Sequence, residues 1–245
     1  MIVYGKNAVR EALSGDDPIE KLLIEKGNFD KSLNEIIRLA KQKNVLVSFA
    51  DKRALTEKAG CPNHQGAVLI KGEFEYSSVE DMLNLAKSKG EKALLVILDG
   101  ITDPHNLGAI LRSAECFGAH GVVISKHRSA VVNGTVIKTS AGAAAHIMVA
   151  KVTNINDTIR ELKESGVWVY ATDFDGDAPS SVDLHGNIAI VIGSEGEGIK
   201  RLTKELCDGT LTIPQFGKVN SLNASVATGV TLYECTRQRH SEYQK

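Results

Sequence analysis

The chain has 245 residues, of which 42% are hydrophobic and 24% charged, and a formal net charge of −1, a composition that excludes disordered and collagen-like chains. No apolar run approaches the ~20 residues that a membrane span needs, and the N-terminus lacks the apolar stretch of a signal peptide. Four cysteines do not make a disulfide framework in so long a chain. We therefore expect a cytoplasmic protein with no membrane partner, folded as one large domain or as one small and one medium domain.

The N-terminal part of the chain alternates helical and extended patterns. Apolar spacing predicts helices over residues 7–13, 30–43 and 51–59 and strands over residues 21–24, 45–49 and 67–70. Residues 71–91 are polar and acidic at first and become helical after a cap at Ser77 or Ser78. We therefore predict an N-terminal domain over residues 1–74, a linker and first helix over residues 75–91, and a second domain over residues 92–245.

The second domain contains apolar runs of strand length. They cover residues 93–98, 122–124, 147–150, 167–171, 188–192 and 210–213, and helical patterns over residues 106–117, 154–164, 200–207 and 222–239 separate most of them. Continuous hydrophobicity is typical of strands that are buried on both faces. The alternation therefore indicates an α/β domain whose mostly parallel sheet is covered by helices on both sides.

Three loops of this domain are rich in glycine and polar residues. They are residues 99–108 (DGITDPHNLG), 193–198 (GSEGEG) and 214–225 (PQFGKVNSLNAS), and each follows an apolar strand and precedes a helix. In open parallel sheets, ligands bind beyond the carboxyl ends of the strands, where such loops lie. We therefore expect the three loops to form the ligand site.

The glycine-rich loop at residues 193–198 fits more than one class of ligand. Its three glycines allow main-chain N–H groups to approach a ligand closely. The order G-x-x-G-x-G reverses the dinucleotide fingerprint, and Ile213 stands about 20 residues on, where ribose recognition needs an acid. A nicotinamide-dependent oxidoreductase and a turn without a ligand stay open as alternatives. A phosphate-binding P-loop is excluded, because Val219 follows Gly217 and Lys218.

Arg112 is the candidate anion-binding residue of the first loop. Asn106 stands at a plausible helix N-cap, and Arg112 follows six residues later, almost two turns along the same helix and near its start. With Gly108 and Ser113 nearby, its guanidinium could clamp a phosphate through two parallel hydrogen bonds. A solvated helix arginine is the alternative interpretation.

The remaining candidate residues predict no further site. Cys61 and His64 form a Cys-x-x-His pair, but no second pair of ligands follows at zinc spacing, so no metal site is predicted. We interpret His120 and His146 as loop or core histidines. Ser221 has no His and Asp partner pattern, so the sequence does not support a nucleophilic serine.

Charge is distributed unevenly along the chain. Residues 105–151 contain five basic residues and one acid, residues 152–211 five basic and eleven acidic, and residues 1–72 twelve basic and nine acidic. A face that collects the basic residues of 105–151 could bind nucleic acid, although the composition does not require it.

The three loops also carry a family resemblance. Three segments resemble, in order and spacing, the three motifs of the SpoU (TrmH-like) RNA ribose 2′-O-methyltransferases of the SPOUT superfamily. They are residues 98–124 (LDGITDPHNLGAILRSAECFGAHGVVI), 190–199 (IVIGSEGEGI) and 213–234 (IPQFGKVNSLNASVATGVTLYE). The opening YGKNAVREAL and the later HQGAVLI resemble the small substrate-binding domain of bacterial 23S rRNA guanosine-2′-O-methyltransferases. Gln215 and Asn220 depart from the residues that are common in the third motif.

The resemblance implies a fold, a cofactor and partners. The fold would be a C-terminal α/β knot, in which the chain end threads through a loop to form a trefoil, preceded by a small L30e-like α/β substrate-binding domain. The cofactor would be S-adenosyl-L-methionine, the assembly a homodimer with its active site near the interface, and the substrate structured RNA. The expected reaction is 2′-O-methylation of a ribose, that of a guanosine in 23S ribosomal RNA. A transfer RNA ribose methyltransferase and a non-catalytic RNA-binding protein are the alternatives.

The resemblance also assigns roles to individual residues. It implies that the cofactor is bound by Gly193, Ser194, Gly196, Ile213, Leu222 and Ser225. It implies that the catalytic site consists of Asn106, Arg112, Glu195, Ser221 and Asn223. Arg112 would hold the phosphate and hydroxyl of the target, because an arginine pKa above about 12 makes deprotonation costly. Glu195 is the other candidate base, or it pairs with Arg112.

Overall fold

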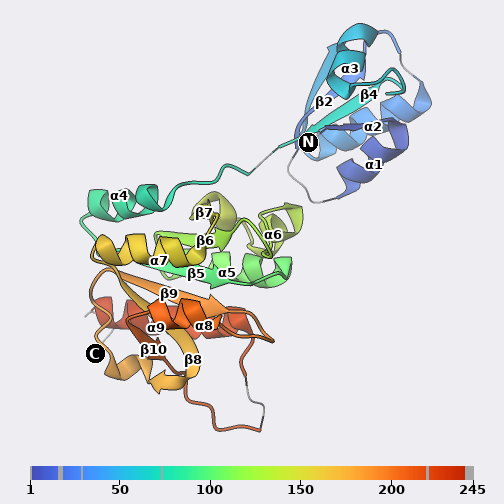
Figure 1. Cartoon of the computed structure of the whole chain (residues 1–245). Coiled ribbons are helices and arrows are strands. Elements are labelled where there is room, and N and C mark those ends of the chain that lie inside the picture. The colour runs from blue at the N-terminus through green and yellow to red at the C-terminus, as the bar shows by residue number, and fades with distance from the viewer. Residues whose placement is uncertain (1, 16–18, 29, 73, 219–220, 241–245) are drawn as a thin grey trace. The chain divides into compact units, whose positions relative to one another are not determined.

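The computed structural model describes residues 2–15, 19–28, 30–72, 74–218 and 221–240. The chain divides into two compact units, one of residues 1–75 with 133–135 and one of residues 76–132 with 136–245 (Figure 1). Both units combine helices with a sheet, so the predicted α/β class is confirmed.

The N-terminal unit packs helices against a mixed sheet. Its elements are β1 (Ile2–Tyr4), α1 (Lys6–Ser14), β2 (Ile19–Glu25), α2 (Lys31–Gln42), β3 (Leu46–Ala50), α3 (Lys52–Ala59) and β4 (Ala67–Lys71). The strand order is β1-β4-β2-β3, with β2 and β3 parallel and the other neighbours antiparallel. Apart from the short β1, each of these elements was expected from the apolar pattern.

Helix α2 shows how the sequence builds this core. Asp30 precedes the helix, and its carboxylate accepts a hydrogen bond from the main-chain N–H of Leu33 at 2.9 Å, which satisfies a free donor of the first turn. Leu33, Ile36 and Ala40 recur on one face and are completely buried, whereas Ile37 is only partly buried against the same core. Each large apolar side chain buried in this way stabilises the fold by about 1.5–3 kcal/mol.

The larger unit contains the remaining elements. They are α4 (Val79–Lys89), β5 (Leu94–Asp99), α5 (Pro104–Cys116), β6 (Gly121–Ser125), α6 (Gly134–Thr139), β7 (Met148–Val152), α7 (Ile155–Glu164), β8 (Trp168–Asp177), β9 (Ile188–Gly193), α8 (Arg201–Leu206), β10 (Gly209–Leu211) and α9 (Ala224–Arg239), with 3₁₀ turns at Ala143–Ala145 and Pro179–Ser181. Helix α4 begins after Ser78, whose hydroxyl accepts from the N–H of Asp81 while the Asp81 carboxylate accepts from the N–H of Ser78.

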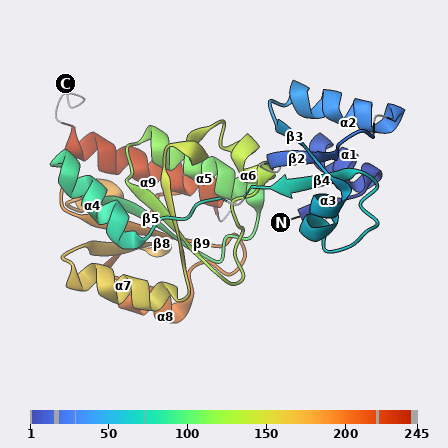
Figure 2. The ribbon, with the colours of Figure 1, turned by 90° about the horizontal axis from the view of Figure 1, so that it is seen from above.

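The sheet of the larger unit brings the three predicted loops to one edge. Its strand order is β10-β8-β9-β5-β6-β7, and neighbouring strands are parallel throughout the described residues. Helices α5 and α9 cover one face and α7 and α8 the other (Figure 2). Strands β5 and β9 lie side by side in the middle and are almost entirely buried. Because all strands point the same way, the loops after β5, β9 and β10 leave the sheet at its carboxyl edge.

The start of α5 differs from the prediction. The helix begins at Pro104, and the carboxylate of Asp103 accepts from the N–H of His105 at 2.9 Å, so Asp103 is the N-cap and Asn106 is not. Proline fits the first helical position because its missing N–H would be unpaired there in any case. Arg112 therefore lies in the second half of α5 and not near its start.

Other predicted boundaries are also wrong. Strand β8 continues to Asp177, beyond the predicted end at residue 171, and β10 ends at Leu211. The close approach of the two strands needs Gly176, where a Cβ would lie 2.2 Å from the carbonyl oxygen of Thr210. Helix α6 occupies a stretch where no helix was predicted. The trefoil knot stays a prediction. None of the helices within the described ranges has the length and apolar character of a membrane span.

Candidate active site

The loops after β5 and β9 and the start of α9 meet in a cluster of three hydrogen-bonded side chains. The amide of Asn106 donates to Oε1 of Glu195 at 3.0 Å, and the amide of Asn223 donates to Oδ1 of Asn106 at 2.9 Å. The Asn223 amide also donates to Oε1 of Glu195. Three residues predicted for the catalytic site, far apart in the sequence, therefore lie in direct contact.

Asn223 is fixed from its other side as well. It is the N-cap of α9, and its Oδ1 accepts hydrogen bonds from the main-chain N–H of Ser225 at 2.9 Å and from the Ser225 hydroxyl at 2.5 Å. With the oxygen turned toward the helix, the NH₂ group points to Asn106 and Glu195. The cap of α9 thus orients one side of the cluster.

The loop after β9 is held in a tight turn that presents Glu195. Ser194 and Gly198 exchange two main-chain hydrogen bonds, of 3.1 and 3.0 Å. Gly193 lies directly against this turn, and a Cβ there would be 2.3 Å from the carbonyl carbon of Gly198. Glycine is therefore required at position 193 by close packing of the main chain.

An ion pair between the buried carboxylate of Asp99 and the exposed Lys200 ties the same loop to β5. Asp99 is the last residue of β5 and only 2% exposed, and its carboxylate accepts from the main-chain N–H of Lys200 at 3.0 Å and from Nζ of Lys200 at 2.5 Å. Charge-assisted hydrogen bonds of this kind are about twice as strong as neutral ones. The turn that carries Glu195 is thus anchored at both ends.

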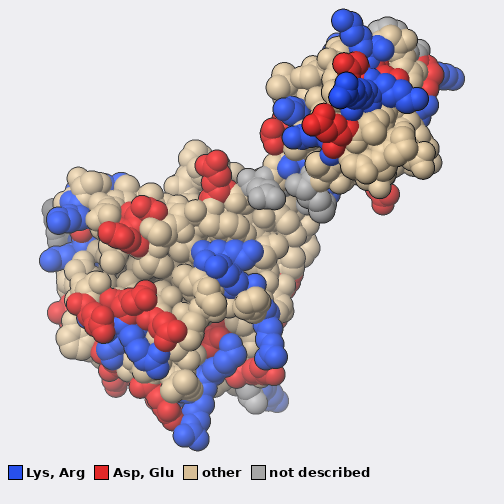
Figure 3. Space-filling view, turned by 45° about the horizontal axis from the view of Figure 1, so that its top comes forward, with Lys and Arg blue, Asp and Glu red and all other residues tan. Residues whose placement is uncertain are grey.

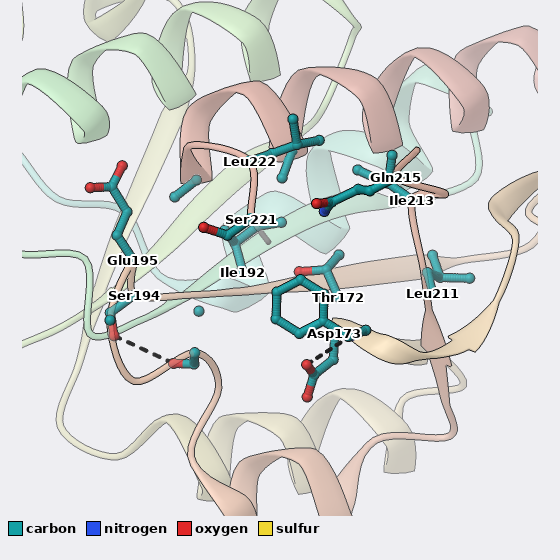
Figure 4. A pocket seen from close by; sticks show the side chains of 16 residues that line it. Thr172, Asp173, Ile192, Ser194, Glu195, Leu211, Ile213, Gln215, Ser221 and Leu222 are labelled. Atoms are coloured by element: carbon teal, nitrogen blue, oxygen red, sulfur yellow. Dashed lines mark hydrogen bonds between the residues drawn. The ribbon is translucent and has the colours of Figure 1, made fainter. Parts of the chain in front are cut away.

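A cavity of about 330 Å³ opens beside the cluster (Figure 4). Its lining combines apolar side chains with a polar rim and consists of Thr172, Asp173, Phe174, Ile192, Gly193, Ser194, Glu195, Gly196, Gly198, Leu211, Ile213, Gln215, Ser221, Leu222, Ala224 and Ala227. Ile192, Ile213 and Leu222 supply apolar surface, and Ser194, Glu195 and Ser221 supply oxygen atoms. Such a cavity fits a small organic ligand that has an apolar part and a polar part.

The predicted cofactor residues are mostly found in this lining. Gly193, Ser194, Gly196, Ile213 and Leu222 line the cavity. Ser225 does not line it, and its side chain instead binds Asn223. Of the predicted catalytic residues, Glu195 and Ser221 line the cavity, while Asn106 and Asn223 lie beside it through their bonds to Glu195.

Arg112 stands apart from the cluster. It is exposed, and it makes no hydrogen bond or ion pair with any of the described residues, so the pairing with Glu195, which was one of the alternatives for that residue, is not observed. Arg112 follows Asn106 by six residues on α5, which places the two side chains about 120° apart around the helix axis. The structure therefore joins Asn106 and Asn223 to Glu195 and not to Arg112.

The middle of β8 contributes lining residues that the sequence analysis missed. Thr172 binds the carbonyl of Val191 through its hydroxyl at 2.9 Å, and Asp173 pairs with Nζ of Lys204 at 2.6 Å. Lys204 also pairs with Asp175 and lowers the pKa of that carboxyl below its usual value. The signal was present, because Thr172 follows an apolar strand of the same parallel sheet and so reaches the same edge.

The other singled-out residues have structural roles. His64 is buried, where its Nδ1 accepts from the N–H of Gly66 at 3.1 Å and its Nε2 lies 3.2 Å from the Thr56 hydroxyl. In the described ranges, no group of three or more His, Cys, Asp or Glu side chains is placed to hold a metal ion. His120 is buried in the larger unit, and His146 is exposed.

Comparison with known families gives two matches along the chain. Residues 93–233, which contain the cluster and the cavity, match the SpoU rRNA Methylase family. Residues 2–77 match the RNA 2′-O ribose methyltransferase substrate binding family. The two matches together follow the division of the chain into two units.

Similar proteins agree with these matches over nearly the full chain. The 23S rRNA (guanosine-2′-O-)-methyltransferase RlmB of Xanthomonas campestris is 44% identical over 97% of this chain and 96% of its own. A Staphylococcus aureus protein assigned to the TrmH family of tRNA/rRNA methyltransferases is 42% identical over 98% of this chain and 96% of its own. The SpoU methyltransferase AviRb of Streptomyces viridochromogenes, solved with bound AdoMet, superposes with a TM-score of 0.64 and 26% identity, over 98% of this chain and 90% of its own. The chain therefore belongs to the SpoU family of RNA methyltransferases.

Proposed function

We propose that this protein transfers a methyl group from S-adenosylmethionine to a ribose 2′-hydroxyl of RNA, and that its target is a guanosine of 23S ribosomal RNA. The observation that carries the proposal is the contact of Asn106, Glu195 and Asn223, which puts a carboxylate at the rim of an apolar cavity. The similarity to the Xanthomonas enzyme, which is a 23S rRNA guanosine-2′-O-methyltransferase, supports the choice of RNA and nucleotide.

The cavity fits the methyl donor. Its volume of about 330 Å³ lies at the lower end of ligand pockets, and its apolar side chains suit an adenine ring. At Gly196 no other atom lies within 4 Å of the place where a Cβ would stand, so the main chain is open to a ligand there. S-adenosylmethionine, when bound, supplies an electrophilic methyl carbon. AviRb, which binds AdoMet, supports the assignment.

We propose that the carboxylate of Glu195 accepts the proton of the attacking hydroxyl. A ribose hydroxyl is a poor nucleophile until its proton is removed. Oε1 of Glu195 accepts from both amides of the cluster, whereas Oε2 has no partner among the described residues and can accept the proton. Asn106 and Asn223 then act by holding the carboxylate in one orientation, which contributes to the several kcal/mol that positioning supplies.

Arg112 is assigned to the phosphate beside the target ribose. Its guanidinium has no partner among the described residues, so its donors are available for two parallel bonds to a phosphate. A guanidinium stays protonated at neutral pH, which makes it an orienting and charge-stabilising group and not a base. This role requires that Arg112 reach the same ribose as Glu195.

We propose a homodimer that brings Arg112 to that ribose. On α9, Val226, Val230 and Tyr233 form an exposed apolar stripe, with exposed fractions of 50%, 42% and 56%. Phe117, the C-cap residue of α5, extends the stripe, because its ring meets that of Tyr233 at a centroid distance of 6.3 Å. Apolar surface of this extent is typical of a contact with another chain. Arg112 is exposed on α5, five residues before Phe117.

Complementation tests the dimer and the shared site together. We expect Arg112→Ala and Glu195→Gln to be inactive alone. When the two are co-expressed, one site of each mixed dimer holds both native residues if the site is shared. Random pairing of equal amounts then restores about one quarter of the native activity, whereas a site within one protomer restores none. A monomer in analytical ultracentrifugation refutes the dimer directly.

We propose that residues 1–74 select the RNA. The match to a substrate-binding family over residues 2–77 supports this role. On the face seen in Figure 3, Lys and Arg side chains gather on the N-terminal unit and in the middle of the larger unit, and each unit also carries Asp and Glu side chains. Patches of this kind bind phosphates without an overall basic protein, and their affinity falls with salt.

The reaction is tested by incubating the protein with S-adenosylmethionine labelled in the methyl group and with separated ribosomal and transfer RNA fractions, followed by mapping of the modified ribose. We expect label in 23S RNA at one guanosine. Label in transfer RNA alone keeps the chemistry and changes the substrate. No label in any RNA fraction, with the methyl donor bound, contradicts the proposed function and leaves an RNA-binding protein.

A further inference from the structure

A second cavity, of about 480 Å³, lies at the opposite edge of the same sheet. It is lined at the starts of strands by Leu94 of β5, by His120 before β6 and by Ile147 before β7, and it is closed by the last turn of α9. Figures 1 and 2 show the C-terminal end of α9 and helix α4 together on the side where the strands begin. This cavity is therefore separate from the one beside Glu195.

Arg239 forms one wall of this second cavity, and its guanidinium contacts no carboxylate in the described residues. It donates instead to the carbonyl oxygens of Leu184 at 3.1 Å, Lys92 at 3.0 Å, Ala93 at 3.1 Å and Gly186 at 2.6 Å. These acceptors satisfy the N–H groups but carry no net charge. A half-buried cation without an anion in contact is costly, and that cost favours an anionic ligand.

The other groups around the cavity strengthen its positive potential. Lys89 and Lys92 also line it, and neither ammonium pairs with any of the described residues. Of the two acids in the lining, Glu91 is bound to Nε2 of His120 at 3.1 Å, and Glu115 is exposed. Three cations thus face two carboxylates, one of which is already engaged.

Neighbouring titratable groups respond to this potential. Burial lowers the pKa of His120, and the charges of Lys89 and Arg239 lower it further, against the raising effect of Glu91. Burial also lowers the pKa of Arg239, although Cys235 and Glu91 act in the opposite direction. Burial thus makes both residues harder to charge than in water, and for His120 the neighbouring cations add to this effect.

His146 and His240 complete the polar lining with ring nitrogens, which donate hydrogen bonds to oxyanions, whereas Nδ1 of His185 is already paired with the carboxylate of Asp183 at 2.7 Å. Lysine ammonium groups and imidazole N–H groups around a cavity of this size suit a ligand with several charged oxygens. A carboxylate ligand offers two such oxygens, and a phosphate offers three or more.

We propose that this cavity binds phosphate oxyanions. The ligand is either a phosphodiester of bound RNA or the phosphate of a small molecule, and the chemistry of recognition is the same for both. Lys89 and Lys92 provide the mobile cations, and Arg239 provides a fixed one. The proposal is independent of the methyl-transfer site, which lies at the other edge of the sheet.

The test uses the full-length protein and two probes. Pyrophosphate binding is measured by calorimetry in metal-free buffer, and RNA binding is measured by filter retention over a series of salt concentrations. The variants are Lys89→Gln, Lys92→Gln and their combination. The matched control is Lys87→Gln, which removes an exposed charge outside the cavity from α4, the helix that carries Lys89.

If a small-molecule phosphate is the ligand, each substitution in the cavity weakens pyrophosphate binding at least threefold, and Lys87→Gln leaves it unchanged. If RNA is the ligand, the double variant lowers the slope of log affinity against log salt by about 0.7–0.9 for each phosphate that the protein no longer neutralises. S-adenosylmethionine binding stays native in all variants, which separates this result from any failure of the methyl-transfer site. Native affinity of the double variant for both probes, or absence of pyrophosphate binding together with a native salt slope, overturns the proposal.

Discussion

The substitution Gly193→Ala tests whether the turn after β9 holds the methyl-donor site in shape. The added Cβ would lie 2.3 Å from the carbonyl carbon and 2.6 Å from the oxygen of Gly198, and 2.4 Å from the nitrogen of Ile199. All three are main-chain atoms, so no side chain can rotate to make room. Ordinary contact begins near 3.4 Å, so the turn must move by about 1 Å.

The cost of this movement follows from the bonds that close the turn. Ser194 and Gly198 exchange hydrogen bonds of 3.1 and 3.0 Å, and a shift of about 1 Å takes both beyond hydrogen-bond distance. Their loss costs about 1–3 kcal/mol together, and the remaining overpacking costs about 1–3 kcal/mol. We expect a loss of about 3 kcal/mol, which lowers the melting temperature of a unit of this size by about 6–12 °C.

The assay compares Gly193→Ala with Gly186→Ala. Gly186 precedes β9, has no positive φ, and would place a Cβ with no atom within 4 Å, so alanine should be neutral there. Scanning calorimetry measures the melting temperatures, and isothermal titration measures S-adenosylmethionine binding at 25 °C. We expect a lower melting temperature and at least tenfold weaker binding for Gly193→Ala alone. A melting temperature within 1 °C of that of Gly186→Ala, with native binding, refutes the packing argument.

Further predictions concern the separate parts of the site and the thiols. Arg112→Ala should lower kcat by about 100-fold or more in the methylation assay. The affinity for S-adenosylmethionine and the melting temperature should stay native, because Arg112 is exposed and unpaired among the described residues. An equal loss of S-adenosylmethionine binding would mean that Arg112 has a structural role. A fragment of residues 76–245 should fold and bind the methyl donor but modify RNA poorly, and full activity of the fragment refutes substrate selection by the N-terminal domain. Burial raises the pKa of the Cys207 thiol to about 12 and that of the Cys235 thiol to about 11, so both thiols stay protonated at pH 8. A thiol reagent at pH 8 should therefore label the exposed Cys116 first. Fast labelling of Cys235 in the native protein contradicts its burial.

The sequence predicted the edge of the sheet at which the site lies, and the reason is general. Strands β5 and β9 are continuous apolar runs, which identifies them as interior strands of a parallel sheet, and parallel strands send their following loops to one edge. The elements of the N-terminal unit were predictable for a related reason. Amphipathic spacing, such as that of Leu33, Ile36 and Ala40, encodes both the helix and its buried face.

Prediction from the local sequence was wrong where two helix-start signals competed, and where contacts between residues far apart along the chain determine the structure. Asn106 is a good capping residue, but Asp103 followed by Pro104 is a stronger start signal and determines where α5 begins. The role of Thr172 was missed because the polar residues after residue 171 end the apolar run, whereas pairing with β10 extends the strand. Pairing of this kind is a tertiary contact that no window of sequence contains.

The cluster of Asn106, Glu195 and Asn223 depends on such contacts throughout. Asn106 and Glu195 are 89 positions apart, and Asn223 and Asn106 are 117 apart, so their hydrogen bonds exist only because β5 and β9 are neighbours and α9 packs on α5. Among the described residues, this cluster contains a proton acceptor, the carboxylate of Glu195, but contacts no cation. Arg112 is exposed on the same helix as Asn106, about 120° away around the helix axis. If a cation acts on the same ribose as Glu195, we therefore expect it to come from a second protomer, which the complementation experiment tests.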